Sequence, residues 1–149
     1  MKLSGEQIVP ASREAVYDAM LDPETLKGAL PGCEKLEEIG PNEYLATMTI
    51  GVAMIKGKYD GRVKITDDTR PESFTMHIEG KGPQGQLSGV GTVKFESLGE
   101  NETKVVYDGD ANVRGMLARI GSRVIQPAAN MIVGKFFTEL SSKVSSPNS

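Results

Sequence analysis

The sequence predicts an α+β fold in which a curved antiparallel sheet of about seven strands wraps around one long C-terminal helix. Three observations predict it. Apolar and polar residues alternate through most of the chain from Tyr44 to Val113, which is typical of strands with one covered face. Two short helical patterns follow the first strand. A single long helical pattern then spans Gly115 to Val144.

The N-terminal part of the chain contains one strand and two short helices. Weak alternation over residues 2–9 predicts the first strand. Ser12 has the character of an N-cap and opens a helix that runs to about Leu21. Asp22 caps the next helix, with Pro23 at its first position, where the missing N–H costs little.

The middle of the chain is predicted to be strand throughout. The turn sequences GPNE, DDTRPES, KGPQGQ and LGENET divide it at hairpin spacing. Glycine is frequent within the two central strands, where it permits sharp curvature or the close approach of another group. These glycines are Gly80, Gly82, Gly85, Gly89 and Gly91. A sheet that bends strongly can wrap around something.

The long C-terminal pattern carries an apolar stripe that changes position along its length. On a helical wheel one face collects Leu117, Ile120, Val124, Ala128 and Met131. Beyond that point the stripe, including Phe137, lies well over about 90° further around, at 100° per residue. Pro127 falls between the two patterns and removes a backbone hydrogen bond, so we expect a kink or a break there. Residues 1–144 are expected to form one domain, and 145–149 a disordered tail.

Composition limits the class of protein. The chain has 149 residues, a net charge of −3 and a single cysteine, with neither a bilayer-spanning apolar run nor a secretory signal. We therefore expect a cytoplasmic protein. From Thr103 onward six basic residues face three acids, a split that does not resemble a nucleic-acid binder. It suits docking to an acidic protein or to lipid headgroups, or a solvated helix face.

The residues offer no catalytic or metal-binding constellation. A nucleophilic or metal-binding role for Cys33 would require a neighbouring base or further ligands. His77, the only histidine, alternates with inward residues and should point outward, so no Cys–His pair forms inside. Asp108 and Asp110 share the polar outer face. Cys33 is therefore interpreted as a loop residue that packs at the mouth of the barrel.

Four segments resemble the G-subunit family of aerobic carbon monoxide dehydrogenase, within the START/Bet v 1-like polyketide cyclase superfamily. They are LPGCEKLE, IKGKYDGRVKITD, GPQGQLSGVGTV and VRGMLARIGSRVIQPAANMIVGKFF. The resemblance implies a helix-grip fold with a hydrophobic cavity between helix and sheet. It also implies an accessory protein of a molybdenum hydroxylase, associated with recruiting the enzyme to the inner face of the cell membrane and with handling quinone there.

Seven methionines and no tryptophan are unusual in a chain with few aromatic residues. Methionine either adapts to an irregular apolar ligand or fills an imperfect core. The resemblance favours a cavity that binds a quinone, a fatty acid or a lipid, with no covalent cofactor required. The expected lining is Met48, Ile50, Tyr59, Met76, Ile78, Gly89, Tyr107, Met116, Leu117, Ile120 and Val124.

A docking surface is expected on the last helix. Arg119 and Arg123 lie one turn apart, on the same predicted outward side as Phe137. An exposed aromatic residue beside basic groups is typical of a contact with an acidic protein or an anionic membrane. In the alternative interpretation, Phe137 folds under the loop around Cys33 or under the two short helices.

Two functions from different classes remain. The first is a non-catalytic binding protein that docks to a molybdenum hydroxylase, and the second is a polyketide-cyclase-like or hydrolytic enzyme that uses the same cavity. Titratable groups at inward positions would favour the enzyme. The inward set is mostly apolar, with Tyr59 and Tyr107 as its polar members, which favours the binding protein.

Overall fold

The computed structural model describes residues 1–52 and 54–144 and confirms the predicted α+β helix-grip fold. The disordered tail predicted for residues 145–149 lies outside these described residues. In chain order the elements are β1 (Lys2–Val9), α1 (Arg13–Ala19), α2 (Pro23–Ala29), β2 (Cys33–Gly40), β3 (Glu43–Ile50), β4 (Gly57–Thr69), β5 (Ser73–Gly82), β6 (Gly85–Gly99), β7 (Glu102–Arg114), α3 (Met116–Ile120) and α4 (Ser122–Val144).

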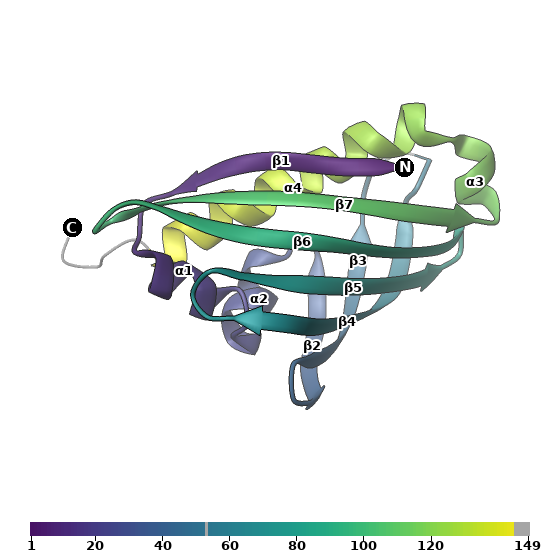
Figure 1. The fold of residues 1–149 in the computed structure, drawn as a ribbon. Helices are drawn as coiled ribbons and strands as arrows, with labels where there is room; N and C mark the ends of the chain where they lie inside the picture. Colours follow the sequence, from purple (N-terminus) through teal and green to yellow (C-terminus); the bar gives the residue numbers. More distant parts are fainter. Residues whose placement is uncertain (53, 145–149) are drawn as a thin grey trace.

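The strands form one antiparallel sheet in the order β1-β7-β6-β5-β4-β3-β2. Strands β2 to β7 follow one another as hairpins, and β1 pairs with β7, so β1 and β2 are the edges. The sheet curls around α4 (Figure 1). Helix α1 lies at the end of the sheet that carries the β4–β5 and β6–β7 turns, and α3 lies at the opposite end.

The two short helices begin where their capping residues predict. The side-chain oxygen of Ser12 accepts a hydrogen bond from the N–H of Ala15 at 3.2 Å. Asp22 accepts from both the N–H and the hydroxyl of Thr25, at 3.0 and 2.7 Å. Each cap satisfies a donor that the first helical turn leaves without a partner. Because α2 packs against both α4 and β2, these caps also position one wall of the grip.

The apolar interior is divided into two clusters. The larger one gathers the buried faces of α1, α2 and the second half of α4 over one end of the sheet. Its centre is the aromatic trio Tyr17, Phe74 and Phe95, whose ring centroids lie 5.1–5.6 Å apart. The smaller cluster, at the α3 end, consists of Ile55, Leu117, Ile125 and Ala128 with partly buried neighbours. The inner face of the sheet continues between the two clusters.

The C-terminal helical pattern breaks at Gly121, not at Pro127 as predicted. Gly121 adopts φ 85°, a backbone conformation that residues with a side chain rarely adopt, and it separates α3 from α4. Its N–H still donates to the carbonyl oxygen of Leu117 at 3.1 Å, which closes α3. Pro127 then lies in the second turn of a helix that continues to Val144.

The exposure of three residues in the C-terminal helical pattern corrects three predictions. Met116 and Met131, expected to face inward, are 49% and 43% exposed. Phe137, expected on an outer docking surface, is 5% exposed. Its ring stacks on that of Tyr107 with centroids 6.0 Å apart, and it meets the ring of Phe136 edge-on. The alternative interpretation, that Phe137 is buried, is the correct one, although the surface it covers is the sheet.

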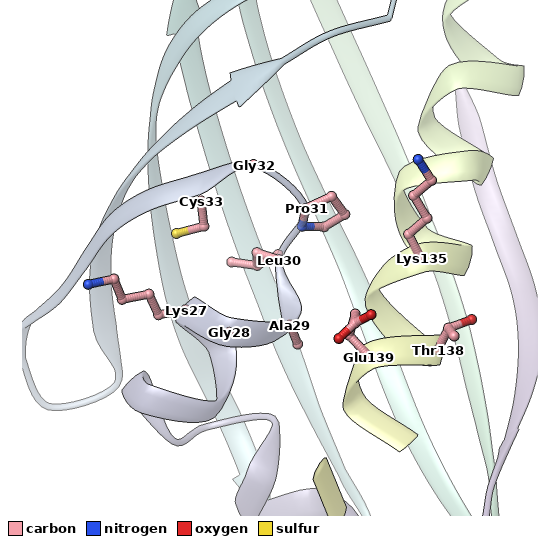
Figure 2. Close-up of a pocket in the computed structure, with 10 residues that line it drawn as sticks. All are labelled: Lys27, Gly28, Ala29, Leu30, Pro31, Gly32, Cys33, Lys135, Thr138 and Glu139. Atoms are coloured by element: carbon pink, nitrogen blue, oxygen red, sulfur yellow. The ribbon is translucent and has the colours of Figure 1, made fainter. Parts of the chain in front are cut away.

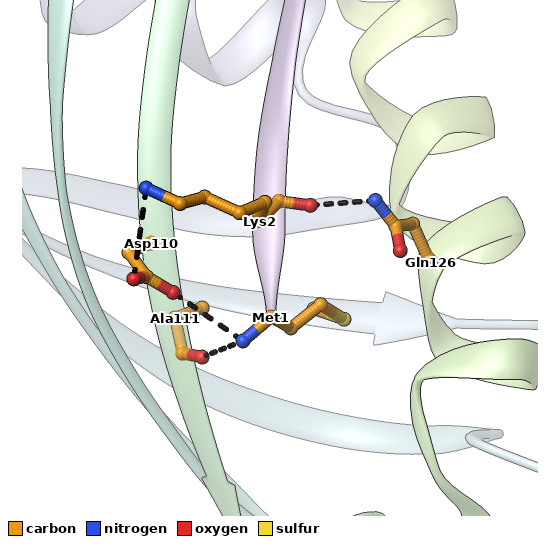
Figure 3. A network of polar contacts seen from close by, with 5 residues as sticks. All are labelled: Met1, Lys2, Asp110, Ala111 and Gln126. Carbon is orange, nitrogen blue, oxygen red and sulfur yellow. Dashed lines mark hydrogen bonds and ion pairs between the residues drawn. The ribbon is translucent and has the colours of Figure 1, made fainter.

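Polar contacts hold the start of α4 against the edge strand (Figure 3). The side-chain amide of Gln126 donates to the carbonyl oxygen of Lys2 at 2.6 Å. The terminal ammonium of Met1 donates to the carbonyl oxygen of Ala111 at 2.9 Å and lies 3.3 Å from a carboxylate oxygen of Asp110. Helix α4 is therefore attached to β1 by a hydrogen bond as well as by apolar packing.

The corrected orientation of α4 predicts opposite outcomes for two substitutions on one helix. Phe137→Ala should lower the free energy of unfolding by roughly 3–5 kcal/mol, because it removes a buried ring and leaves a cavity against Tyr107. Met131→Ala, on the exposed side, should stay within about 0.5 kcal/mol of the parent. Urea unfolding followed by circular dichroism measures both. Similar losses for the two variants would contradict this orientation.

Candidate ligand-binding site

The inner face of the sheet between the two clusters is built largely from small residues. Cross-strand partners share a face, so the pairing of Gly61 with Gly80 places two glycines side by side on β4 and β5. Gly89 pairs with Ala111 in the same way on β6 and β7. Ile78, between Val63 and Gly89 on adjacent strands, is the large apolar residue in this region.

Open space lies over these glycines. A Cβ atom placed at Gly80 would meet no other heavy atom within 4 Å. At Gly61 the atoms within 4 Å would be the carbonyl oxygens of Ala46 and Glu79, which belong to the same sheet. No atom of α4 therefore lies within 4 Å of a Cβ at either glycine, although the sheet curls around that helix.

Side-chain exposure also indicates open space at this part of the inner face. Ile78 is in phase with Phe74 on β5, and the ring of Phe74 is 1% exposed in the larger cluster. Ile78 itself is 37% exposed, although it points to the inner face. The smaller cluster, around Leu117, begins only farther along the sheet. We call the accessible inner surface centred on Gly61, Ile78 and Gly80 the hollow.

The predicted lining residues divide among several places. Leu117 is buried in the smaller cluster, and Ile50 and Ile120 pack against it. Met116 is exposed on α3 and does not line the interior. The remaining members are half-buried, apart from the more exposed Ile78, and those on strands occupy inner-face positions: Met48, Tyr59, Met76, Ile78, Gly89, Tyr107 and Val124.

Two tyrosine hydroxyls near the inner face are occupied by structural hydrogen bonds. Tyr59 donates to the carbonyl oxygen of Ile55 at 2.7 Å, and Tyr44 donates to that of Leu21 at 2.6 Å. Burial raises the pKa of both phenols above the usual value. The ring of Tyr59 also lies against Gly82, where a Cβ would collide with it. These groups shape the floor of the hollow and are poorly suited to proton transfer at neutral pH.

The ionisable side chains weighed above as catalytic candidates point away from the hollow. His77 is exposed on the outer face, as predicted, with its ring Nε2 3.1 Å from the hydroxyl of Thr66. Asp108 and Asp110 are exposed there too, and Asp110 holds the N-terminal ammonium (Figure 3). Within the described residues, no group of three or more His, Cys, Asp or Glu side chains is placed to hold a metal ion.

A cleft of about 570 Å³ lies between the α2–β2 connection and α4 (Figure 2). One side of the cleft is formed by residues 27–33 and the other by Lys135, Thr138 and Glu139 of α4. Figure 2 shows the strands of the sheet passing behind this gap. Sequence reasoning missed the cleft, because it depends on the distance between segments that are remote in the chain.

Cys33 lines this cleft, half-buried, and it is the first residue of β2 instead of the loop residue that was predicted. Its thiol donates to the carbonyl oxygen of Lys35 at 3.4 Å. Burial raises the pKa of the thiol, and the smaller opposing influences of that hydrogen bond and of Lys27 do not reverse the shift. A nucleophilic cysteine requires the opposite shift.

The predicted docking residues do not form one surface. Arg119 is exposed on α3 and Arg123 at the start of α4, whereas Phe137 belongs to the larger cluster, toward the other end of α4. None of the helices in the described part of the chain is long and apolar enough to cross a bilayer.

The comparisons with known proteins agree on family and fold. Residues 5–145 match the family of the carbon monoxide dehydrogenase G subunit (CoxG). A conserved protein from Geobacillus kaustophilus superposes with a TM-score of 0.93 at 28% identity, covering 97% of this chain and 95% of that one. No match to a curated protein was found.

More distant solved structures share the fold. The Zhui aromatase/cyclase from Streptomyces sp. R1128 gives a TM-score of 0.71 at 16% identity, over 97% of this chain and 93% of that one. A START superfamily protein from Mycobacterium smegmatis gives 0.74 at 13% identity, over 96% of both chains. These likenesses confirm the START/polyketide cyclase-like helix-grip fold.

The environment of Cys33 predicts a slow thiol. Because the thiolate is the reactive form and burial raises the pKa, alkylation by iodoacetamide at pH 8 should be slower in the folded protein than in the urea-unfolded chain. The rise of the alkylation rate with pH should also occur at a higher pH in the folded protein than in the unfolded chain. Cys33→Ala should cost about 1 kcal/mol or less in unfolding free energy. Alkylation of the folded protein as fast as that of the unfolded chain would contradict this.

Proposed function

This chain belongs to the carbon monoxide dehydrogenase G-subunit family, and on that basis we propose that it is a non-catalytic accessory protein of an aerobic carbon monoxide dehydrogenase or a related molybdenum hydroxylase. In this role it binds an apolar ligand, a quinone or a lipid, in the hollow. It also docks the enzyme or recruits it to the membrane.

The observation that carries the binding role is the open space over Gly80 and Gly61. Close packing is the normal state of a protein interior, and unfilled apolar surface costs stability. Here Ile78 is left 37% exposed on the inner face. A ligand with a flat or flexible apolar body would restore the missing contacts, and the half-buried thioethers of Met48 and Met76 can adapt to its shape.

The chemistry of the inner face favours an uncharged ligand. Four strands carry no charged residue at their inner positions. These positions are every second residue from Tyr59 to Ile65 on β4, from Phe74 to Gly82 on β5, from Leu87 to Phe95 on β6, and from Val105 to Val113 on β7. A buried carboxylate without a partner is strongly unfavourable. A quinone ring therefore suits the hollow better than a fatty-acid anion. A lipid would have to keep its charged headgroup outside, at the cleft beside Lys27 and Lys135.

The same inner positions support a carrier over an enzyme. A cyclase or hydrolase in the hollow would need a group that transfers protons or attacks the substrate. The hydroxyl of Tyr59 is held by the carbonyl oxygen of Ile55, and burial raises its pKa. The half-buried thiol of Cys33 lines the cleft beside α4, and its pKa is raised as well.

Filling the hollow should abolish ligand binding. Decylubiquinone should raise the melting temperature of the parent by about 5–10 °C when present far above its dissociation constant, because it binds only the folded state. Gly80→Leu places a side chain in the open space and should remove most of this shift. Dodecanoate, a carboxylate of similar length, should give a smaller shift than the quinone. Differential scanning fluorimetry measures all three effects.

The matched control is Lys81→Leu, which adds the same side chain to the same strand but on the exposed outer face. It should keep the full quinone shift. A parent that shows no shift with decylubiquinone, dodecanoate or phospholipid would overturn the binding role. Equal binding by Gly80→Leu and the parent would move the ligand away from the hollow. The accessory role is tested separately, by co-purification of the parent with the molybdenum hydroxylase of its own host.

A further inference from the structure

One end of the molecule combines segments that are distant in sequence. The β3–β4 connection (51–57, excluding 53), the β5–β6 turn (82–85) and residues 114–123 lie together there; we call this surface the α3 end (Figure 1). The N–H of Leu117 donates to the carbonyl oxygen of Gln84 at 2.8 Å. Ile55 and Leu117 share the smaller apolar cluster. The three segments therefore form one continuous surface.

Two methionines project from the α3 end into solvent. Met54 is 60% exposed and adopts φ 74°, a left-handed conformation that is unusual for a residue with a side chain. Met116 is 49% exposed on α3. Each is followed in the chain by an anchored residue, because Ile55 and Leu117 are 7% and 6% exposed in the smaller cluster. The backbone that carries the two exposed methionines is therefore held in place by buried neighbours.

The charge of the α3 end has a single sign. Lys56, Arg114, Arg119 and Arg123 are all exposed, and the sequence of the three segments contains no Asp or Glu. None of the four forms a salt bridge with a carboxylate of the described residues. The three segments therefore carry positive charge only, around two apolar side chains.

The opposite end of the molecule is acidic. Helix α1 and the β4–β5 and β6–β7 turns, residues 13–19, 67–72 and 99–102, contain seven carboxylates and two arginines. The chain as a whole has a net charge of −3, so it gains no overall attraction to an anionic surface. Its charge is instead separated along the sheet, and an anionic surface would attract the α3 end and repel the other.

We propose that the α3 end docks on the surface of an anionic lipid bilayer, with Met54 and Met116 entering the headgroup region and the four cations lying over acidic headgroups. Basic residues beside a membrane gain favourable energy from its negative surface potential, and apolar side chains gain from burial at the headgroup boundary. The proposal rests on the proposed function for its purpose, since it identifies the surface through which a carrier of apolar molecules would meet the membrane.

A bilayer fits this surface better than an acidic protein does. Protein interfaces rely on a well-packed central group of large side chains, with polar pairs of both signs around it. The α3 end offers two separate flexible methionines and charges of one sign only. The headgroup region of a bilayer is a diffuse anionic layer into which a small apolar side chain can enter. Docking there does not require the shape and charge complementarity of a protein interface. The smaller cluster lies directly beneath this surface, between it and the hollow.

Vesicle binding of the full chain tests the proposal. The parent should co-sediment with phosphatidylcholine vesicles that contain phosphatidylserine, and not with vesicles of phosphatidylcholine alone. Raising the salt should weaken the binding. Arg119→Glu with Arg123→Glu should weaken it by at least about tenfold, because two favourable charges become repulsive. Met54→Ser with Met116→Ser should also weaken vesicle binding, and this loss should be the same at low and at high salt.

Two matched controls accompany these variants. Lys64→Glu with Lys94→Glu changes the net charge by the same amount on the exposed outer face of the sheet. Met131→Ser removes an exposed methionine from α4 outside the α3 end. Both controls should bind vesicles as the parent does. All variants should keep the parent's melting curve and its quinone shift; if the methionine pair unfolds, the arginine pair decides alone.

The outcomes separate this proposal from the proposed function. Absence of parent binding to anionic vesicles, or equal losses in the control and arginine pairs, overturns membrane docking. The proposal is also overturned if the parent ignores vesicles but binds the purified molybdenum hydroxylase through Arg119 and Arg123, because the partner would then be a protein. If the parent binds anionic vesicles but takes up no quinone in solution, the carrier role is contradicted and the docking surface is retained.

Discussion

One helix is too narrow to cover a seven-stranded sheet, and most of the architecture follows from this mismatch. Seven strands at their usual spacing span roughly 30 Å, whereas a helix with its side chains is about 10–12 Å across. The sheet can meet α4 only by curling, and it packs closely at two places, near α1 and near α3. Between them, a Cβ atom at Gly80 would meet no other atom within 4 Å, and one at Gly61 would meet only carbonyl oxygens of the sheet. The hollow results from how the sheet is covered.

Local chemistry explains why so much of the fold was predictable. Alternation, turn composition and the caps at Ser12 and Asp22 each depend on residues a few positions apart, so a linear reading captures them. The orientation of α4 was not accessible in that way. A helical wheel assumes an unbroken helix, and the single residue Gly121, with its φ of 85°, resets the phase for everything that follows. Exposure also depends on what each stretch of helix meets: Ala128 packs in the smaller cluster and Phe137 in the larger one, whereas Met116, which precedes the break, and Met131 remain exposed.

The sequence predicted which residues face the interior at the candidate site, but it did not predict the open space over them. Period-two alternation correctly placed Tyr59, Met76 and Ile78 on the inner side of the sheet. Whether anything lies opposite them depends on the cross-strand pairing of Gly61 with Gly80 and on the path of α4, and neither can be calculated from one strand. The exposure of Met54 was likewise hidden, because a left-handed residue in a connection leaves no periodic signal.

The attachment of α4 to β1 has a further consequence, for association between copies of the chain. An open sheet has two edges whose unpaired backbone groups can recruit a strand from another molecule. At β1 the carbonyl oxygen of Lys2 already accepts from Gln126, and α4 packs alongside that strand. At β2 the pairing with β3 is interrupted by register shifts near Cys33 and Glu38, which distort the edge. The sheet thus remains open enough to hold a ligand without offering a regular template for aggregation.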